Sequence, residues 1–389
     1  MAGHDALRPL PRAFHEDVRA RLRKRADGAG VDGLLLLGAG NVTYATGWHF
    51  SVNERPIGLW LPVDSDALLL VPLLEQEYAA AVPGVGVRTY EEFPGERPPV
   101  LWMIEETGAR RLAIDALDAA LLDDARARLD HLALADHARL ERVVKHAAEL
   151  ELVREAARFA DLVLERLRDV GGDIVRQGGT EADLLADCTG YARALLAETH
   201  GEAFQGTKTG ITASVHSGPR AALPHGAVTT RRPRPGEPVV AGIGCHLGGY
   251  HAESGATLVT GEIRPEQLRI MEAMASAGAA TIDALKRGLT CARVNEAALG
   301  ALRAAGLGHA IRHRIGHGMG VEGHEAPWLA PGDETRASPG MVFSCEPGVY
   351  RPGVDGWRTI DTLLVGGAGV ELASRFQTRH PLETRILSC

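Results

Sequence analysis

The sequence predicts an α+β protein of two domains, in which an α/β domain precedes a larger domain with an antiparallel sheet. The chain has 389 residues, a length that suggests two domains, each with its own hydrophobic core. Over residues 1–143, short apolar segments alternate with helical patterns, which is typical of an α/β layer structure. Over residues 144–389, the expected helices are separate from runs of strands, which indicates an α+β domain.

The first domain is expected to begin with an Arg-rich amphipathic helix over residues 13–30, which ends near a pair of glycines. A buried strand over residues 31–37 follows, and residues 41–47 are expected to turn into further β structure. The other expected strands are residues 57–61, 67–71, 85–90 and 111–114. The helices between them are expected over residues 74–81, 98–107 and 117–129.

The second domain is expected to begin with a long helix over about residues 147–170, because apolar residues recur there at helical spacing. Pro265 favours the start of a later helix, since proline is well accommodated in the first turn. The later helices are expected over residues 181–199, 265–287 and 292–305. The expected strands are residues 203–213, 238–246, 249–259, 341–350 and 359–365, and a loop is expected over residues 313–326.

The composition excludes several classes of protein. The formal net charge is −8 and 24% of the residues are charged, so the chain lacks the basic balance that nucleic-acid binding requires. Its apolar runs, such as residues 33–37 and 67–71, are too short to span a bilayer, which needs about 20 residues. The start of the chain has no apolar segment of signal-peptide length. Five cysteines, an odd number spread far apart, are typical of reduced thiols, so we expect a cytoplasmic protein.

The segment from Arg312 to Pro327 holds the densest group of reactive side chains. His317 begins the sequence His-Gly-Met-Gly, and His324 begins His-Glu-Ala-Pro. Glycines allow the backbone to approach a ligand, and imidazoles transfer protons or bind metal ions. A solvated surface loop is the alternative interpretation, but three histidines beside four glycines favour a functional site.

Three more residues that can carry chemistry lie on expected strands or at their ends. His225 follows Pro224, and Glu253 ends the sequence Gly-Tyr-His-Ala-Glu. Glu346 interrupts an apolar strand, where an ionised carboxylate must be paired, hydrogen-bonded or functional because its burial alone is costly. A salt bridge at the end of the strand is the alternative interpretation of Glu346.

These motifs resemble, in order and spacing, those of the pita-bread family, which includes creatinase, prolidase, aminopeptidase P and methionine aminopeptidase. The resemblance rests on residues 317–320, 324–327, 339–348 and 361–362. In the first half, residues 41–47 and 54–56 resemble the creatinase-type N-terminal domain. The resemblance implies a pita-bread catalytic domain over residues 144–389, preceded by a creatinase-like α/β domain over residues 1–143.

The resemblance also implies where metal ligands would fall. Metallopeptidases of the family hold two divalent ions with two Asp, one His and two Glu. The first Asp falls on Gly242 and the last Glu on Ile360, neither of which can bind a metal ion. The ligand positions that are retained are Glu253, His317 and Glu346. We therefore expect no metal cofactor, with a single zinc on these three residues as the alternative.

By resemblance to creatinase and ectoine hydrolase, we expect a metal-independent hydrolase of a C–N bond. The substrate would be an amide or amidine in a small carboxylate-bearing molecule. His225 falls on the histidine that creatinase uses, and it is expected to move protons. Arg55 falls on the family's carboxylate-binding arginine from the neighbouring subunit, which implies a homodimer. Arg358 is a second residue expected to bind the substrate carboxylate.

The remaining site residues are each expected to have a role in hydrolysis. His317 and His324 would donate to the developing oxyanion, and Glu346 would orient an imidazole or a water. Glu253 would be either the general base or a covalent nucleophile. Three other functions stay open: a metal-dependent Xaa-Pro dipeptidase or aminopeptidase P, a repurposed enzyme of specialised metabolism, and a pseudoenzyme that binds without catalysis. No nucleic-acid or membrane partner is expected.

Overall fold

The computed structural model describes residues 7–389, which divide into two compact units. One unit comprises residues 8–142, and the other comprises residues 143–389 together with Leu7. Among the described residues, no helix is both long and apolar enough to cross a membrane. Each of the five cysteines is a free thiol; four are buried and Cys389 is exposed.

A mixed sheet of six strands forms the centre of the N-terminal unit, in the order β4-β3-β2-β1-β5-β6. The pairs β1–β2 and β2–β3 are antiparallel, whereas β1–β5, β3–β4 and β5–β6 are parallel. The strands are β1 (Gly33–Leu36), β2 (Gly58–Pro62), β3 (Leu68–Pro72), β4 (Gly86–Tyr90), β5 (Arg111–Ile114) and β6 (His131–Leu134). The helices are α1 (Arg12–Gly28), α2 (Ala39–Thr46), α3 (Gln76–Ala80), α4 (Pro99–Glu106), α5 (Leu122–Arg126) and α6 (His137–Arg142).

The expectation of β structure over residues 41–47 is wrong, because these residues form most of helix α2. Asp115, directly after β5, accepts hydrogen bonds from the backbone amides of Leu37 and Gly38 at 2.7 and 3.1 Å. It also accepts one from the Asn41 side chain at 2.7 Å. These bonds fix the residues that lead into α2 and one side chain of its first turn. They come from a residue far away in the sequence, so the local pattern does not reveal them.

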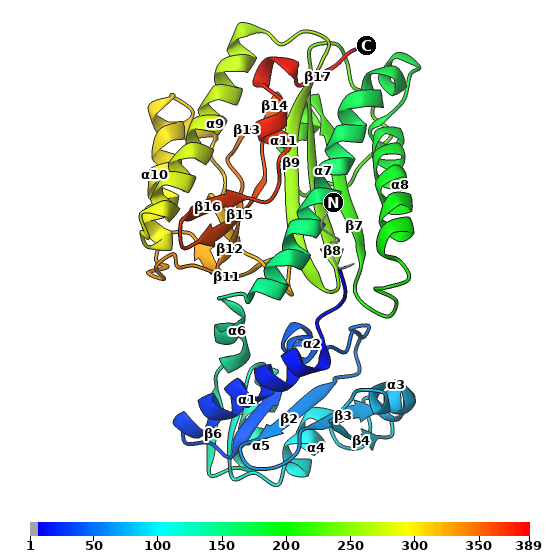
Figure 1. Cartoon of the computed structure of the whole chain (residues 1–389), viewed down its shortest axis with the longest axis vertical. Helices are drawn as coiled ribbons and strands as arrows, with labels where there is room; N and C mark the ends of the chain where they lie inside the picture. Colours follow the sequence, from blue (N-terminus) through cyan, green and yellow to red (C-terminus); the bar gives the residue numbers. More distant parts are fainter. Residues whose placement is uncertain (1–6) are drawn as a thin grey trace, which may run out of the picture. The chain divides into compact units, whose positions relative to one another are not determined.

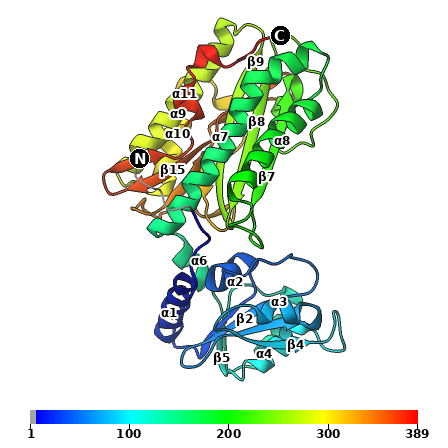
Figure 2. The same cartoon turned by 45° about the vertical axis from the view of Figure 1, so that its right-hand side comes forward.

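One half of the C-terminal unit is a four-stranded sheet covered by two long helices (Figures 1 and 2). Its strands lie in the order β17-β9-β8-β7, and only β17 is parallel to its neighbour. They are β7 (Gly210–Ser217), β8 (Pro238–Leu247), β9 (Tyr250–Thr260) and β17 (Ile386–Leu387). Helices α7 (Ala147–Arg176) and α8 (Glu181–His200) pack on this sheet through apolar side chains such as Leu152, Phe159 and Leu184.

The other half is a five-stranded antiparallel sheet with two further helices (Figure 1). The strand order is β11-β10-β12-β15-β16. The strands are β10 (Gly316–Gly318), β11 (Glu325–Leu329), β12 (Val342–Cys345), β15 (Asp361–Gly366) and β16 (Gly369–Leu372). Helices α9 (Pro265–Lys286) and α10 (Cys291–Ala304) share one apolar core with this sheet, around Met274, Leu302 and Phe343. The remaining elements are β13 (Gly348–Arg351), β14 (Asp355–Arg358), α11 (Phe376–Arg379) and the 3₁₀ turns such as η5 (Leu382–Thr384).

Three expected segments of the second half differ from the structure. The strand expected over residues 203–213 begins only at Gly210, because the preceding residues form a turn after α8. The segment 313–326, expected to be a loop, contains β10 and the start of β11. The strand expected over residues 341–350 is broken between β12 and β13, since Pro347 has no N–H to donate to a sheet. This break leaves Glu346 at the end of a strand.

Alanine substitutions at two helix glycines should change the stability of the C-terminal unit in opposite directions. A Cβ at Gly172, on the buried face of α7, would collide with the backbone of Ser388, whereas a Cβ at Gly190 on α8 would meet nothing within 4 Å. We expect Gly172→Ala to lower the free energy of unfolding by about 1–3 kcal/mol, because the backbone cannot move away cheaply. Gly190→Ala should raise it by about 0.5–1 kcal/mol, because alanine favours a helix. Urea denaturation measures both, and effects of the same sign would contradict this packing.

Candidate active site

Side chains from separate strands meet around one cavity of the C-terminal unit. Glu253 projects from β9, His317 lies on β10, and Glu346 follows β12. His324 precedes β11, and Arg358 is the last residue of β14. The cavity has a volume of about 250 Å³, and its lining includes His225, Glu253, His324, Glu346 and Arg358. His317 lies directly behind this lining, because its Nε2 is 3.0 Å from the Glu346 carboxylate.

His317 is the most enclosed of these side chains, with 1% of it exposed. Its Nε2 lies 3.0 Å from Glu346 Oε1 and 3.9 Å from Glu253 Oε2. Even so, this nitrogen makes no well-aligned hydrogen bond among the described residues. Burial alone would lower the pKa of His317, but the two carboxylates outweigh burial and raise it. The surroundings of this ring therefore favour a positive charge.

Glu253 is held by two side chains outside the expected set. Ser344 donates to its Oε2 at 2.9 Å, and His251 Nε2 lies 3.0 Å from its Oε1. His246 Nε2 lies 3.2 Å from His251 Nδ1, so the two rings form a chain that leads away from Glu253. Burial and the neighbouring His251 lower the pKa of His246 to about 3, which keeps that ring neutral. His251 and Glu253 are two residues apart on β9, so both side chains lie on one face of the strand. This spacing is the sequence signal that places His251 in the site.

Arg358 brings a buried positive charge to the cavity. Its side chain is 6% exposed and contacts the hydroxyl of Tyr350. Within residues 7–389 it forms no salt bridge, and its Nε has no hydrogen-bond partner. Burial alone would raise the pKa of Glu346, but His317 and Arg358 outweigh burial and lower it to about 2. A buried guanidinium without a carboxylate partner is suited to bind an anion.

The cavity offers a place for one divalent ion. One ligand atom from each of Glu253, His317 and His324 lies within 4.8 Å of the other two. The buried His317 Nε2, which lacks a hydrogen bond in the described chain, is one of these atoms. The alternative set from the sequence contained Glu346; the structure instead groups His324 with the other two residues.

A second ion does not fit. Gly242 offers no side chain, and a Cβ there would collide with the guanidinium of Arg358. Ile360 is buried and packs against Gly255, where a Cβ would lie 2.6 Å from its Cγ1. Two of the positions that carry ligands in the family's metallopeptidases are therefore filled by a cation and by an aliphatic side chain.

His225 lines the cavity from an exposed loop. His216 Nε2 lies 2.7 Å from the carbonyl oxygen of Gly226, and Arg220 donates to the carbonyl oxygen of Ala227. Both bonds hold the backbone directly after His225. No residue from 7 to 389 forms a hydrogen bond with the His225 ring, which can therefore contact a substrate.

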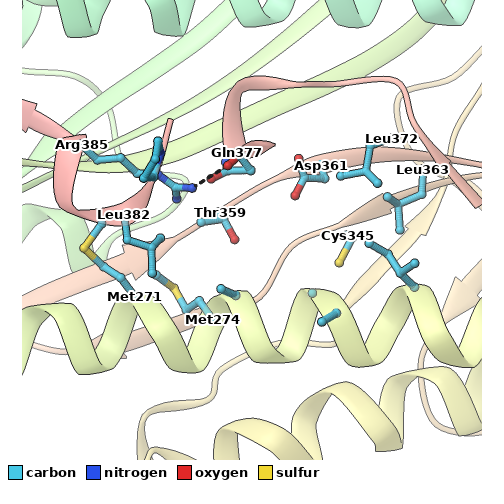
Figure 3. A pocket seen from close by; sticks show the side chains of 15 residues that line it. Met271, Met274, Cys345, Thr359, Asp361, Leu363, Leu372, Gln377, Leu382 and Arg385 are labelled. Atoms are coloured by element: carbon cyan, nitrogen blue, oxygen red, sulfur yellow. Dashed lines mark hydrogen bonds between the residues drawn. The ribbon is translucent and has the colours of Figure 1, made fainter. Parts of the chain in front are cut away.

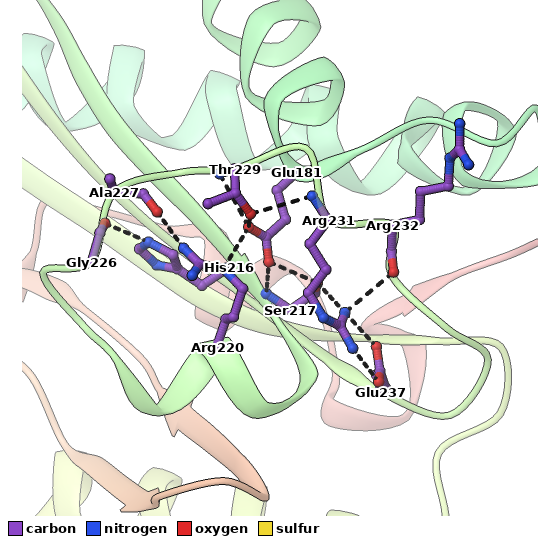
Figure 4. A network of polar contacts seen from close by, with 10 residues as sticks. All are labelled: Glu181, His216, Ser217, Arg220, Gly226, Ala227, Thr229, Arg231, Arg232 and Glu237. Carbon is purple, nitrogen blue, oxygen red and sulfur yellow. Dashed lines mark hydrogen bonds and ion pairs between the residues drawn. The ribbon is translucent and has the colours of Figure 1, made fainter.

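The buried carboxylate of Glu181 organises the rest of this loop (Figure 4). Its Oε1 accepts hydrogen bonds from the amide and hydroxyl of Ser217 at 2.8 and 2.9 Å. Its Oε2 accepts from the hydroxyl of Thr229 at 3.0 Å and from Arg220 at 3.1 Å. Burial alone would raise the pKa of Glu181, but these hydrogen bonds outweigh burial and lower it.

Arg55 belongs to the N-terminal unit. Its Nε donates to Glu92 at 2.9 Å, and it also forms an ion pair with Glu54. Its expected contribution to the site of a neighbouring subunit stays a prediction.

Two family models match the chain. One is "Metallopeptidase family M24", over residues 151–367, and the other is "Creatinase/Prolidase N-terminal domain", over residues 19–144. The chain belongs to metallopeptidase family M24. The pita-bread resemblance and the predicted fold class, a creatinase-type domain followed by a pita-bread domain, are thereby confirmed.

Several M24 proteins resemble this chain over most of its length. The probable dipeptidase PepE of Mycobacterium tuberculosis is 33% identical, over 91% of this chain and 94% of its own. The Xaa-Pro dipeptidase of Lactobacillus delbrueckii subsp. lactis is 28% identical, over 85% of this chain and 89% of its own. The crystal structure of dipeptidase PepE from Mycobacterium ulcerans matches with a TM-score of 0.83 at 28% identity, over 97% of this chain and 99% of that one.

Glu181→Gln tests the network behind His225. We expect this variant to lower the free energy of unfolding at pH 7 by about 1–3 kcal/mol, because buried donors lose a charged acceptor. The lowered pKa of Glu181 means that its contribution is present above the unfolded pKa, near 4.3, and is lost as the pH falls through the folded value. Urea denaturation at pH 7 and at pH values below 4 should therefore show that the variant and the wild type differ less in their free energy of unfolding in acid.

The matched control for this variant is Glu198→Gln, on the exposed face of the same helix. It should change the free energy of unfolding by less than about 0.5 kcal/mol at either pH. A Glu181→Gln variant as stable as this control at pH 7 would show that the network does not hold the loop.

Proposed function

We propose that this M24 protein hydrolyses a C–N bond in a short peptide that has a free carboxylate. The observation that carries the proposal is one cavity lined by the carboxylates of Glu253 and Glu346 and by the guanidinium of Arg358, which forms no salt bridge within residues 7–389. Carboxylates at such a site activate water, and a guanidinium binds a carboxylate through charge-assisted hydrogen bonds. The names of the relatives, dipeptidase and Xaa-Pro dipeptidase, support a peptide as the substrate.

Arg358 would hold the carboxylate of the substrate. Its guanidinium is buried and has no salt bridge in the described chain, so a bound carboxylate would supply the missing opposite charge. The cavity volume of about 250 Å³ suits a substrate of dipeptide size. Because Arg358 and Glu346 line the same cavity, a substrate held there places its C–N bond near the catalytic carboxylate.

Glu253, His317 and His324 would hold one divalent ion, which supplies Lewis-acid polarisation of the scissile carbonyl when it is bound. Glu346 would orient the attacking water and accept its proton. His225, which also lines the cavity, would give a proton to the leaving amine. The proton of the water and the proton of the leaving amine would thus move through different side chains.

A metal-independent C–N hydrolase is the second candidate function. Arg358 favours it, because its guanidinium occupies the space into which a side chain at Gly242 would extend. The guanidinium thus places a permanent positive charge beside Gly242, where the family's metallopeptidases have a metal ligand. In this candidate, Glu253 would act as the general base, since Ser344 and His251 hold it at the cavity wall.

Metal stoichiometry and turnover together separate the two candidates. We expect protein dialysed against Mn²⁺ or Zn²⁺ to retain one ion per chain by inductively coupled plasma mass spectrometry. The rate of hydrolysis of a panel of dipeptides, with and without proline in the second position, should then decrease when a chelator is added. His317→Ala should lose the bound ion, whereas Glu262→Gln, an exposed residue just after β9, should retain it.

The other outcomes have definite meanings. Turnover that survives chelation, with no ion retained, would replace the first candidate by the metal-independent one. Two retained ions per chain would contradict both, since the second place is closed by Arg358 and Ile360. A protein that cleaves no dipeptide or small amide, with or without metal, would overturn hydrolysis itself.

His225→Ala tests the proton donor. We expect kcat to fall by about 10²–10⁴-fold while KM stays within about threefold, because general acid catalysis is lost and the anchor at Arg358 is kept. Steady-state kinetics on the best dipeptide of the panel measures both constants. His309→Ala, which removes an exposed histidine that is not in the cavity lining, is the control and should match wild type. Near-normal turnover of His225→Ala would remove His225 from the mechanism.

A further inference from the structure

A second cavity lies behind the strands that carry the site (Figure 3). It has a volume of about 310 Å³ and is bounded by α9, β12 and β15, with α11 and η5 at one end. Cys345 lines this cavity, and the next residue, Glu346, lines the first one. Successive side chains of a strand point to opposite faces, so the two cavities lie on opposite faces of the same strand end.

Most of the wall of this second cavity is apolar. Figure 3 shows Met271, Met274 and Leu382 at one end of the space and Leu363 and Leu372 at the other. Three small residues of α9 also line it, namely Ala275, Gly278 and Ala279. Ala275 and Ala279 are exposed, so the small side chains leave the cavity open to solvent along this helix. Methionine side chains adapt to ligands of different shape.

Polar groups with unused bonding capacity gather on the opposite wall of the same cavity. Asp361 Oδ1 accepts from Ser374 at 2.9 Å, and its other oxygen has no hydrogen-bond partner among residues 7–389. The buried Oε1 of Gln377 also lacks one in the described chain. Arg385 donates from Nε and Nη2 to the backbone carbonyls of His380 and Gln377 at 3.0 and 3.1 Å, which leaves its Nη1 unused within the described residues.

Asp361 and Arg385 carry opposite charges on this wall, but they form no ion pair within 4.0 Å in the described part of the chain. Burial raises the pKa of Asp361 to about 7 and lowers the pKa of Arg385 to about 10. The two charged groups are therefore incompletely solvated. A ligand with a positive group near Asp361 and a negative group near Arg385 would stabilise both.

We propose that this cavity binds a small zwitterion with an apolar side chain, of the class of the free hydrophobic amino acids. The ammonium group would donate to Asp361 and to Gln377 Oε1, and the carboxylate would accept from Arg385. The apolar side chain would lie against Met271 and Met274. This site is separate from the proposed catalytic cavity, and the proposal does not rest on the proposed function.

Two simpler ligand classes fit the wall less well. A purely apolar molecule would leave the second oxygen of Asp361, Gln377 Oε1 and Arg385 Nη1 without partners and would shield them from water, which is costly. A small anion or cation alone would satisfy one charge and leave the methionine wall uncovered. A zwitterion with an apolar side chain satisfies both parts of the cavity.

Isothermal titration calorimetry with L-leucine and L-methionine tests the proposal on the full-length protein. We expect saturable binding of one amino acid per chain. Isopentylamine, which lacks the carboxylate, and 4-methylpentanoate, which lacks the ammonium group, should each bind at least about tenfold more weakly than leucine. Equal binding of all three would overturn the assignment of Asp361 and Arg385, as would no binding at millimolar concentration.

Two variants of α9 locate the binding site. Ala279→Trp, at an exposed position of the lining, fills the cavity mouth and should weaken leucine binding at least about tenfold. Ser276→Trp, exposed on the same helix but outside the lining, should bind leucine as wild type does. If His324→Ala abolishes binding and Ala279→Trp does not, the amino acid binds in the first cavity and the proposal is wrong.

Discussion

Two carboxylates, Glu253 and Glu346, are largely enclosed at the junction of two sheets, and the need to balance their negative charge constrains the whole site. An enclosed carboxylate is stable only when it is paired or hydrogen-bonded. Ser344 and His251 hold Glu253, while His317 and Arg358 face Glu346. Strands β9, β10, β12 and β14 must keep their relative positions for these pairs to form.

The same constraint explains why Gly242 and Ile360 are tolerated at ligand positions of the family. With one fewer ligand carboxylate on β8 and another missing beside β15, the cavity carries less negative charge. The guanidinium of Arg358 enters the space left at Gly242 and supplies one permanent positive charge. One further cation, or the proton on His317, then balances the remaining carboxylates.

The end of β12 lies between the proposed catalytic cavity and the second cavity. Glu346 and Cys345 are neighbours in sequence and line different cavities, so a ligand bound behind the sheet would touch the residue next to the proposed catalytic carboxylate. The exposed lining residues that helix α9 contributes to the second cavity, Ala275 and Ala279, are small, and they leave the space open to solvent.

The sequence by itself determined the two-domain α/β and α+β arrangement, because hydrophobic periodicity carries that information. Its short motifs determined the family, and the resemblance to that family implied that Glu253, His317 and Glu346 share a site. The tertiary structure alone decided which groups surround them. In the N-terminal unit, Asp115 at the end of β5 holds the entry to helix α2, which contains most of residues 41–47. Arg358 takes the place beside Gly242, and His324 joins Glu253 and His317, since both depend on distances between strands that are far apart in the chain.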